Sequence, residues 1–262
     1  MEAPRIVFED GAGYERMMGV WSRLAGDVFL DWLQPPARSD WLDVGCGNGA
    51  FTQAIVDRCA PASVAGIDPS DAQIAYARGR PAGQVASFDV GDAQALPFGD
   101  RSFDIAVMAL VIFFVPDPAR GVAEMARVVR PGGCVCSYAW DILGGGFPLA
   151  PLGRVLKDMG VPAPLPPSVE AARMDVLRAL WQQAGLQEVD TREISVQRTF
   201  PDFDEFWTTS LLSASTRARI ATLSPTQVGE VRKRLRAAVQ PAADGSVTCQ
   251  ARANAIRGTV PR

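Results

Sequence analysis

Apolar and polar positions near the start of the chain follow the period of an α-helix. From Tyr14 to Leu33 the apolar side chains recur every three or four residues, at positions 14, 17, 18, 21, 24, 25, 28, 29 and 32. This spacing places them on one face of a helix. Pro35 and Pro36 follow, and because proline cannot continue a helix, we expect the helix to end before them.

Between residues 40 and 140, short apolar runs alternate with amphipathic stretches. This order favours a parallel β-sheet covered by helices on both faces. The sequence Arg130-Pro131-Gly132-Gly133 is expected to stop the last of these helices. Strands are predicted at 40–45, 63–68, 84–89, 103–108 and 134–140, and helices at 48–59, 70–79 and 118–129.

The alternation breaks after residue 141. Gly144-Gly145-Gly146 and the proline-rich residues 161–168 enclose a segment that we interpret as a capping insertion. Ser168 is a candidate cap for the next helix, which ends at Gly185. The remaining predicted elements are helices at 151–159, 202–213 and 225–238, the last opened by Ser224-Pro225, and strands at 186–197 and 246–257.

Composition narrows the range of partners. The chain has 262 residues and a net charge of −3, and its arginines are scattered among acids. Binding to nucleic acid needs a clustered basic face, so we expect no nucleic-acid partner. No apolar run approaches the roughly 18 residues of a membrane span, and the first ten residues are too polar for a signal peptide. The five cysteines favour reduced thiols in a cytoplasmic protein without a membrane partner.

The chain contains no histidine. This excludes Ser-His-Asp and Cys-His hydrolases and removes the commonest general base and metal ligand. The stretch after the fourth predicted strand is apolar and offers no carboxylate. We therefore expect a reaction that does not depend on a metal.

The most informative stretch is WLDVGCGNGAFT, residues 41–52, in which an apolar strand passes through a glycine-rich turn into a helix. Glycine has no Cβ, so the backbone can turn sharply there and approach a ligand closely. The free N–H groups at the start of the helix attract negative charge such as a carboxylate. A dinucleotide fingerprint is the alternative, but it has G-x-G-x-x-G, whereas this turn has G-x-G-x-G preceded by Asp43.

Further elements follow in order. Asp68 ends the second predicted strand, 19 residues beyond Gly49, where a carboxylate can accept from both hydroxyls of a ribose. Asp92 follows the third strand and can accept from an adenine amino group, while Ala93 donates its backbone N–H to the ring. Taken singly, these acids also suit a helix cap and a surface turn. The last two elements are 103–110, leading to 115–118, and 128–133.

Taken together, these five elements resemble the cofactor-binding core of class I S-adenosylmethionine (SAM) methyltransferases over residues 40–141. Residues 14–23, 200–207 and 243–258 are similar to a bacterial small-molecule branch of that family, the ubiquinone/menaquinone-biosynthesis type. The resemblance implies an α/β fold, a Rossmann-like doubly wound sheet of seven strands, mostly parallel with the last strand antiparallel. It also implies one domain, with an N-terminal cap helix (1–35), a SAM-binding core (36–141), an inserted cap (142–175) and a C-terminal part with the acceptor-side helices (176–262).

The resemblance further implies a site for SAM, with S-adenosylhomocysteine as the product. The Gly45-Cys46-Gly47-Asn48-Gly49 backbone would hold the methionine part, and Asp43 would orient its ammonium group. Asp68 would bind the ribose, with Pro69 and Ser70 beside the adenine. Asp92 and Ala93 would read the adenine edge. Lining of the sulfonium is implied for Met108, Ala109 and Leu110, with Phe113 nearby.

Candidates for the chemical step are fewer. Many relatives carry a histidine after strand four, where this chain has Val111-Ile112-Phe113-Phe114, so proton removal by histidine is not expected. Orienting the acceptor toward the methyl group would supply most of the rate. If a base takes part, Asp141 and Tyr14 are the candidates; the alternatives are a turn cap for Asp141 and a core aromatic for Tyr14.

We therefore expect a SAM-dependent methyltransferase that acts on a small molecule as a monomer or homodimer. Aromatic residues at 140, 147, 203, 206 and 207 suit an apolar acceptor pocket, although such residues more often form core. Two other functions stay open. One is a SAM-binding protein that catalyses decarboxylation or cyclisation, or uses SAM structurally; the other is an NAD-dependent oxidoreductase.

Overall fold

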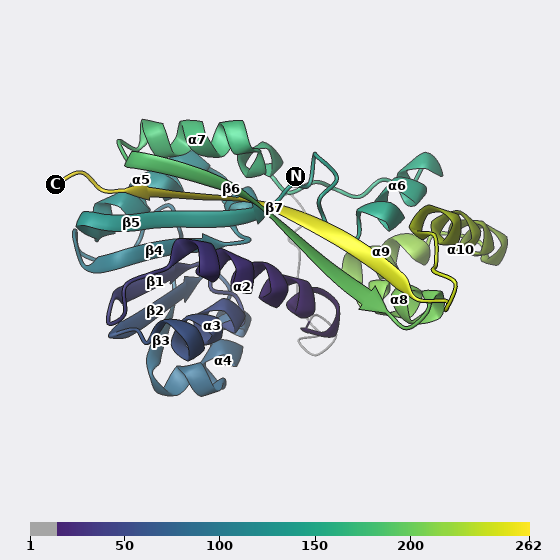
Figure 1. The fold of residues 1–262 in the computed structure, drawn as a ribbon, viewed down its shortest axis with the longest axis horizontal. Coiled ribbons are helices and arrows are strands. Elements are labelled where there is room, and N and C mark those ends of the chain that lie inside the picture. Colours follow the sequence, from purple (N-terminus) through teal and green to yellow (C-terminus); the bar gives the residue numbers. More distant parts are fainter. Residues whose placement is uncertain (1–14) are drawn as a thin grey trace. The chain divides into compact units, whose positions relative to one another are not determined.

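The computed structural model describes residues 15–262, and its central feature is a seven-stranded β-sheet (Figure 1). The strands are β1 (Asp40–Val44), β2 (Ser63–Asp68), β3 (Ala86–Val90), β4 (Phe103–Ala109), β5 (Val129–Trp140), β6 (Gln187–Phe200) and β7 (Val247–Thr259). Their order across the sheet is β3-β2-β1-β4-β5-β7-β6. The first five strands pair in parallel and β7 runs antiparallel to β5. The predicted Rossmann-like, mostly parallel sheet is confirmed.

The strand order creates a reversal point between β1 and β4. The chain builds outward from β1 to β3 and then returns to place β4 on the other side of β1. β1 and β4 are parallel neighbours, with Asp43 opposite Val107. Their carboxyl ends therefore leave the same edge and diverge, and in open α/β sheets ligands bind at such a point.

Helices connect the strands. The sheet is preceded by η1 (Glu15–Gly19), one turn of π-helix, and α2 (Val20–Leu33). The helices between and after the strands are α3 (Ala50–Cys59), α4 (Asp71–Arg78), η2 (Pro81–Gln84), η3 (Ile112–Phe114), α5 (Pro118–Val128), α6 (Ala150–Asp158), η4 (Val169–Ala172), α7 (Met174–Gln183), α8 (Phe203–Ser210), α9 (Ala214–Ile220) and α10 (Pro225–Val239).

The chain divides into two compact units. A sheet unit contains Ser22–Gly145, Pro166–Ser195 and Arg252–Arg262, and a helical unit contains Gly146–Leu165, Val196–Ala251 and the described residues up to Trp21. The boundaries differ from the expected cap of 1–35 and 142–175, because residues 22–35, 142–145 and 166–175 belong to the sheet unit. The unit boundaries depend on contacts between segments that are distant in the sequence, and the pattern of apolar and polar positions does not reveal those contacts.

An aromatic cluster explains why the predicted first helix belongs with the sheet. Phe29 of α2 is fully buried, and its ring centroid lies 4.7 Å from that of Tyr138 in β5 and 6.2 Å from that of Phe51 in α3. Tyr138 and Phe51 meet edge to face at 5.5 Å. Removing three such rings from water stabilises the packing of α2 on the sheet unit.

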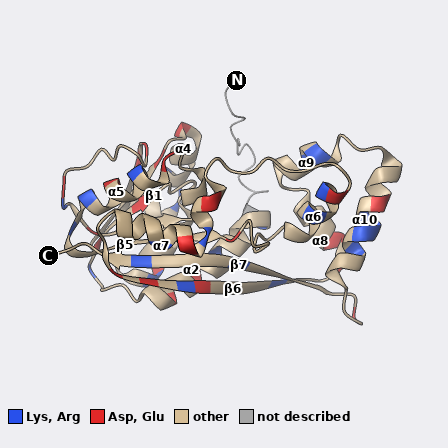
Figure 2. Cartoon of the chain, turned by 90° about the horizontal axis from the view of Figure 1, so that it is seen from above, with Lys and Arg blue, Asp and Glu red and all other residues tan. Residues whose placement is uncertain are grey.

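The helical unit has its own core. Phe203, Phe206 and Trp207 of α8 are buried, and the Phe206 ring lies 5.2 Å from that of Phe200. The guanidinium carbon of Arg232 in α10 lies 5.3 Å from the centroid of the Trp207 ring. Lys and Arg positions on α10 are blue in Figure 2. These contacts favour the core interpretation of the three α8 aromatics over an acceptor pocket.

Several predicted boundaries were wrong. Strand β5 begins at Val129 rather than 134, because Val129 already pairs with Phe103. The helix expected from Ser168 to Gly185 is split into η4 and α7, and the Ser168 side chain does not cap it. Helix α9 was missed altogether. By contrast, Ser224 forms the expected cap of α10, reciprocated by the Gln227 side chain.

Candidate functional site

The glycine-rich turn after β1 is built on left-handed backbone. Gly45, Gly47 and Gly49 have φ values of 76°, 53° and 77°, a region that side chains with a Cβ rarely adopt. The N–H groups of Gly45 and Cys46 both donate to the Ile67 carbonyl oxygen, each at 2.8 Å. The turn is thereby held against the carboxyl end of β2.

The three glycines are needed for different reasons. A Cβ on Gly45 would lie 2.5 Å from a methyl carbon of Val111, which follows β4, and a Cβ on Gly49 would lie 3.1 Å from Ala77. A Cβ on Gly47 would meet no atom within 4 Å. Gly45 and Gly49 therefore serve packing within the protein, whereas the backbone at Gly47 faces open space where a ligand can approach.

Asp43, the last acid before the turn, is completely buried. Its Oδ2 accepts a 2.7 Å hydrogen bond from the Thr52 hydroxyl, while Oδ1 has no partner among the described residues. Burial raises the pKa of Asp43 to about 7, and the Thr52 bond offsets part of that rise. A buried acceptor without a donor is costly, so a cationic or hydrogen-bonding ligand group would be favourable here.

Asp68 connects the turn to the end of β2. Its Oδ2 accepts from the Gly47 N–H at 3.1 Å and its Oδ1 from the Ser70 N–H at 2.9 Å. Partial burial raises the pKa of Asp68, and the two backbone hydrogen bonds act in the opposite direction. Each oxygen keeps a lone pair for a hydroxyl group, and the carboxylate is already oriented beside Gly47.

Asp92 lies in the turn after β3, next to Asp68 in space. The Gly91 N–H donates to the Asp68 carbonyl oxygen at 3.2 Å, which brings the two turns together. The Asp92 carboxylate is exposed and is contacted by Gln94 through its backbone and side-chain N–H groups. No described residue accepts from the Ala93 N–H, so both groups assigned to the adenine edge are available.

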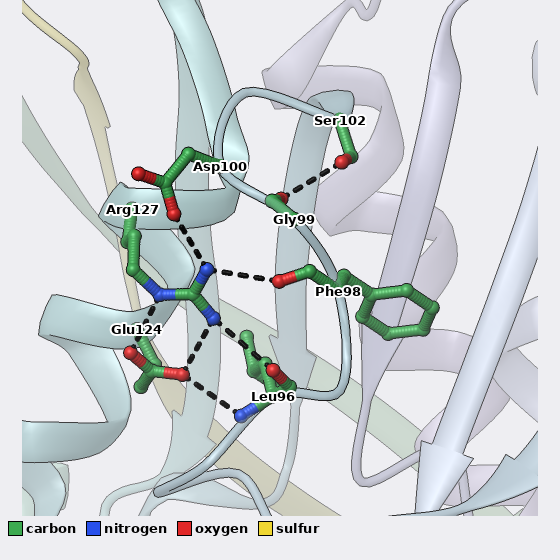
Figure 3. A network of polar contacts seen from close by, with 7 residues as sticks. All are labelled: Leu96, Phe98, Gly99, Asp100, Ser102, Glu124 and Arg127. Carbon is green, nitrogen blue, oxygen red and sulfur yellow. Dashed lines mark hydrogen bonds and ion pairs between the residues drawn. The ribbon is translucent and has the colours of Figure 1, made fainter.

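The loop that follows this turn is fastened by α5 (Figure 3). Glu124 accepts from the Leu96 N–H at 2.8 Å. Arg127 donates to Glu124, to Asp100 and to the carbonyl oxygens of Leu96 and Phe98. These bonds raise the pKa of Arg127, because they favour its charged form. The loop is therefore held as a fixed support behind the Asp92 turn.

The end of β4 contributes backbone strain and apolar surface. Leu110 has a φ of 62°, and its N–H donates to the Tyr138 carbonyl oxygen at 2.8 Å. Met108 is fully buried, and its methyl carbon lies 3.2 Å from where a Cβ on Gly121 of α5 would be. Its side chain therefore packs within the core. Phe113 is buried against the exposed Phe114, with ring centroids 4.6 Å apart.

Proteins of known family are similar to this chain in sequence. A family model described as a methyltransferase domain matches residues 42–137. A 2-methyl-6-phytyl-1,4-hydroquinone methyltransferase of Oryza sativa subsp. japonica is 39% identical over 45% of this chain and 32% of that protein. An O-methyltransferase of Penicillium expansum is 33% identical over 71% and 66%. A ubiquinone/menaquinone biosynthesis C-methyltransferase of Dinoroseobacter shibae is 34% identical over 45% and 48%.

Residues 42–137 therefore form a methyltransferase domain of the class I SAM-dependent type. The chain spans from about a third to two thirds of the length of these curated relatives. Solved structures share the fold of nearly the whole chain. The YcgJ protein of Bacillus subtilis aligns with a TM-score of 0.60 and 16% identity over 92% of this chain and 99% of its own. A phosphoethanolamine N-methyltransferase of Haemonchus contortus, solved with S-adenosylhomocysteine, aligns at 0.59 and 16% over 95% and 56%.

Of the two candidate bases, Tyr14 and Asp141, only Asp141 lies among the residues that the structure describes. Tyr14 lies outside the described residues. Asp141 follows β5, and its Oδ1 accepts from the Gly144 N–H at 3.0 Å while its Oδ2 pairs with Arg252 at 2.6 Å. Both oxygens are thus used to hold the Gly144 turn and β7, which favours the turn-cap alternative for Asp141.

A separate cleft of about 450 Å³ lies beside Asp141 in the sheet unit. None of its lining residues belongs to the turns after β1, β2, β3 or β4. The lining residues are Asp141, Leu143, Gly144, Arg173, Met174, Asp175, Glu193 and Asn254.

Several residues that hold the site together carry no recognisable pattern in the sequence. Thr52, Gln94, Glu124 and Arg127 contact the predicted acids or their loops, and Val111 packs on Gly45. Only Gln94 could have been suspected from the sequence, because it lies two residues beyond Asp92 and a side chain at that spacing can reach the carboxylate. Among the described residues, no cluster of three metal-ligating side chains occurs, and no helix is both long and apolar enough to cross a bilayer.

Proposed function

We propose that this chain binds SAM above the carboxyl ends of β1, β2 and β4 and transfers its methyl group to a small molecule without a metal. The observation that carries the proposal is the hydrogen bond between the open Gly47 backbone and the oriented carboxylate of Asp68, together with the buried Asp43 at the start of the same turn, whose Oδ1 has no partner among the described residues. The open backbone at Gly47 would allow the methionine part of SAM to approach. The unpaired oxygen of Asp43 would accept from its ammonium group, and the two oxygens of Asp68 would accept from its ribose hydroxyls.

The fit of each residue to the cofactor follows from its contacts. Asp43 would accept a hydrogen bond from the ammonium group at Oδ1, which gives that buried oxygen its missing donor. Asp68 would accept from the ribose hydroxyls. The backbone at Cys46 and Asn48 would hold the methionine part, and Pro69 and Ser70 would lie beside the adenine. Asp92 and the Ala93 N–H would meet the amino edge of the adenine.

The end of β4 would surround the reacting sulfur. Backbone and side chains of Ala109 and Leu110 are half-buried there, and Phe113 lies behind them. Met108 would contribute through its backbone, because its side chain packs toward α5. When bound, SAM supplies an electrophilic methyl group and leaves as S-adenosylhomocysteine.

The protein would act on the chemical step chiefly by orientation. Holding the acceptor atom in line with the sulfur–methyl bond replaces several kcal/mol of barrier without an acid or base. Asp141 and Tyr14 remain the candidates for a base. Use of Asp141 would require its ion pair with Arg252 to open, so we place it second to proximity.

We take an electron-rich aromatic ring as the first acceptor class to test. One relative is named for a hydroquinone and another for ubiquinone/menaquinone biosynthesis, and the exposed Phe114 ring beside Phe113 offers an apolar surface at the end of β4. The first probes are therefore a substituted hydroquinone and a matched phenol without the second hydroxyl.

The decisive experiment is calorimetric titration with SAM, S-adenosylhomocysteine and NAD. We expect binding of the first two and none of NAD. Asp43→Asn and Asp68→Asn should each weaken S-adenosylhomocysteine binding at least about ten-fold, because each loses a charged hydrogen bond. Asp158→Asn, at the exposed end of α6, is the matched control and should bind as the wild type does.

Methyl-labelled SAM then separates the two SAM-based functions. Transfer of label into the hydroquinone or into a small molecule of a cell extract supports methyl transfer. Binding of SAM without any label transfer contradicts it and favours the decarboxylase, cyclase or structural role. Absence of SAM and S-adenosylhomocysteine binding overturns the proposal entirely.

A further inference from the structure

Gln94 occupies a position between the adenine-facing turn and helix α5. Its side-chain Nε2 lies 3.2 Å from each carboxylate oxygen of Asp92, and its Oε1 accepts from the Asp117 backbone N–H at 3.0 Å. Asp117 is the N-cap of α5, and its own side chain accepts from the Arg120 N–H. One side chain thus connects an exposed acid to a helix terminus.

The chemistry of the side chain fits this position closely. An amide offers N–H donors at one end and a carbonyl acceptor at the other. The donors must face the Asp92 carboxylate and the acceptor must face the Asp117 N–H, so the network leaves one orientation of the amide. Glutamate at this position could still accept from Asp117 but could not donate to Asp92 while ionised.

The rest of the turn is already fixed from behind. Ala95 donates to the Asp92 carbonyl oxygen at 3.0 Å, and Leu96 is held by Glu124 of α5. The carboxylate of Asp92 is the exposed part of the turn and is free to rotate unless something holds it. Among the described residues, Gln94 makes all the hydrogen bonds that this carboxylate accepts.

We propose that Gln94 is the positioning residue for nucleobase recognition: it turns the Asp92 carboxylate toward the 6-amino group of adenine and fixes it against α5. The inference rests on the proposed function, because it assigns Asp92 to the adenine of the cofactor. It adds that selectivity for adenine depends on a residue that does not itself touch the base.

The test compares two ligands that differ at one group of the base. S-adenosylhomocysteine carries a 6-amino donor, whereas S-inosylhomocysteine carries a 6-oxo acceptor that the Asp92 carboxylate would repel. Calorimetry gives the ratio of their dissociation constants. The wild type should prefer the adenine ligand by about ten-fold or more, the size expected for one charged hydrogen bond.

Two variants separate positioning from mere stability. Gln94→Glu keeps the acceptor for Asp117 and loses the donor to Asp92, and Gln94→Leu loses both. Both variants should lower the preference for the adenine ligand to about two-fold or less, mainly by weakening S-adenosylhomocysteine binding by about five- to ten-fold. Melting temperature should fall in Gln94→Leu and change little in Gln94→Glu. Gln183→Ala, exposed on α7, is the control for substitution of a glutamine.

The outcomes distinguish this inference from the proposed function. If the wild type binds S-adenosylhomocysteine with the expected preference and both Gln94 variants keep it, Gln94 does not position Asp92 and the inference fails alone. Equal weakening of both ligands in the variants also overturns it, because that is the signature of a general loss of structure. No binding of either ligand by the wild type would instead refute the proposed function.

Discussion

At the scale of the residue, buried polar atoms and glycines carry the most specific information about the site. Asp43 leaves one buried oxygen without a partner among the described residues, and a Cβ on Gly47 would meet no atom within 4 Å. Gly45, two residues earlier, instead accommodates Val111. Residues of the same type in one short motif therefore serve the ligand in one case and packing in the other.

The burial of Asp43 makes a pH-dependent contribution to stability. Its pKa is about 7 in the folded protein and has an ordinary value of 3.8. Between these values the carboxyl ionises only in the unfolded chain, so the free energy of unfolding falls as pH rises from about 4 to about 7. In Asp43→Asn this decline should become shallower, which urea unfolding at several pH values measures. An unchanged pH profile would show that Asp43 ionises normally in the folded protein.

The glycines give a paired test of packing against ligand access. Gly45→Ala should lower the free energy of unfolding by about 3 kcal/mol, because the new methyl group overlaps Val111 in addition to straining the backbone. Gly47→Ala should lower the free energy of unfolding by only about 1 kcal/mol, from backbone strain. It should nevertheless weaken S-adenosylhomocysteine binding more than Gly45→Ala does.

Thermal unfolding and calorimetry on the two glycine variants provide both numbers. The double variant Gly45→Ala/Val111→Ala should recover part of the lost stability. Equal losses of stability in the two single variants would contradict the separate roles of Gly45 and Gly47.

At the scale of the element, α5 has a role that its sequence does not reveal. It closes the crossover from β4 to β5 and also fastens the loop after β3 through Glu124 and Arg127 (Figure 3). Arg127 contacts two carboxylates and two carbonyl oxygens with one planar group, a geometry that lysine cannot reproduce.

Arg127→Lys should therefore loosen that loop. We expect a loss of about 2 kcal/mol in the free energy of unfolding, from broken charged hydrogen bonds, and faster amide hydrogen exchange at Leu96. Arg154→Lys on the exposed face of α6 is the matched control. Exchange at Leu96 that matches the wild type in Arg127→Lys would show that Glu124 alone holds the loop.

At the scale of the whole molecule, the chain returns repeatedly between two compact units. Residues of the helical unit come from three separate stretches, and β6 and β7 each have residues in both units. The resemblance alone could not define these boundaries, because they depend on which distant segments pack together. The family match at 42–137 falls entirely within the sheet unit.

The division into two units predicts which residues the cofactor will protect from amide hydrogen exchange. S-adenosylhomocysteine at a hundred times its dissociation constant should stabilise the folded protein by about 2.7 kcal/mol. Protection from amide hydrogen exchange should concentrate at 43–49, 68–70, 91–94 and 108–113 of the sheet unit. Exchange followed by mass spectrometry on the full chain measures this. Protection confined to α8, α9 and α10 would place the ligand elsewhere.

The sequence by itself determined the order of the seven strands along the chain, the glycine turn, and the acids Asp43 near the end of β1, Asp68 at the end of β2 and Asp92 after β3. Those features are local, since apolar period, glycine spacing and strand ends are all written in short stretches of chain. Errors fell where local signals conflict with pairing. Helix α5 ends before Pro131 and its two glycines as predicted, but strand β5 begins at Val129 rather than at 134, because Val129 pairs with Phe103.

Only the tertiary structure decided which oxygen of Asp43 is unpaired, that both oxygens of Asp141 are engaged, and that Gln94 joins Asp92 to α5. Each of these facts depends on two groups brought together from different elements. A sequence pattern specifies which side of an element is buried but not which atom it meets there. Hydrogen bonding depends on atoms a few tenths of a nanometre apart, so the acceptors of the site were predictable and their partners were not.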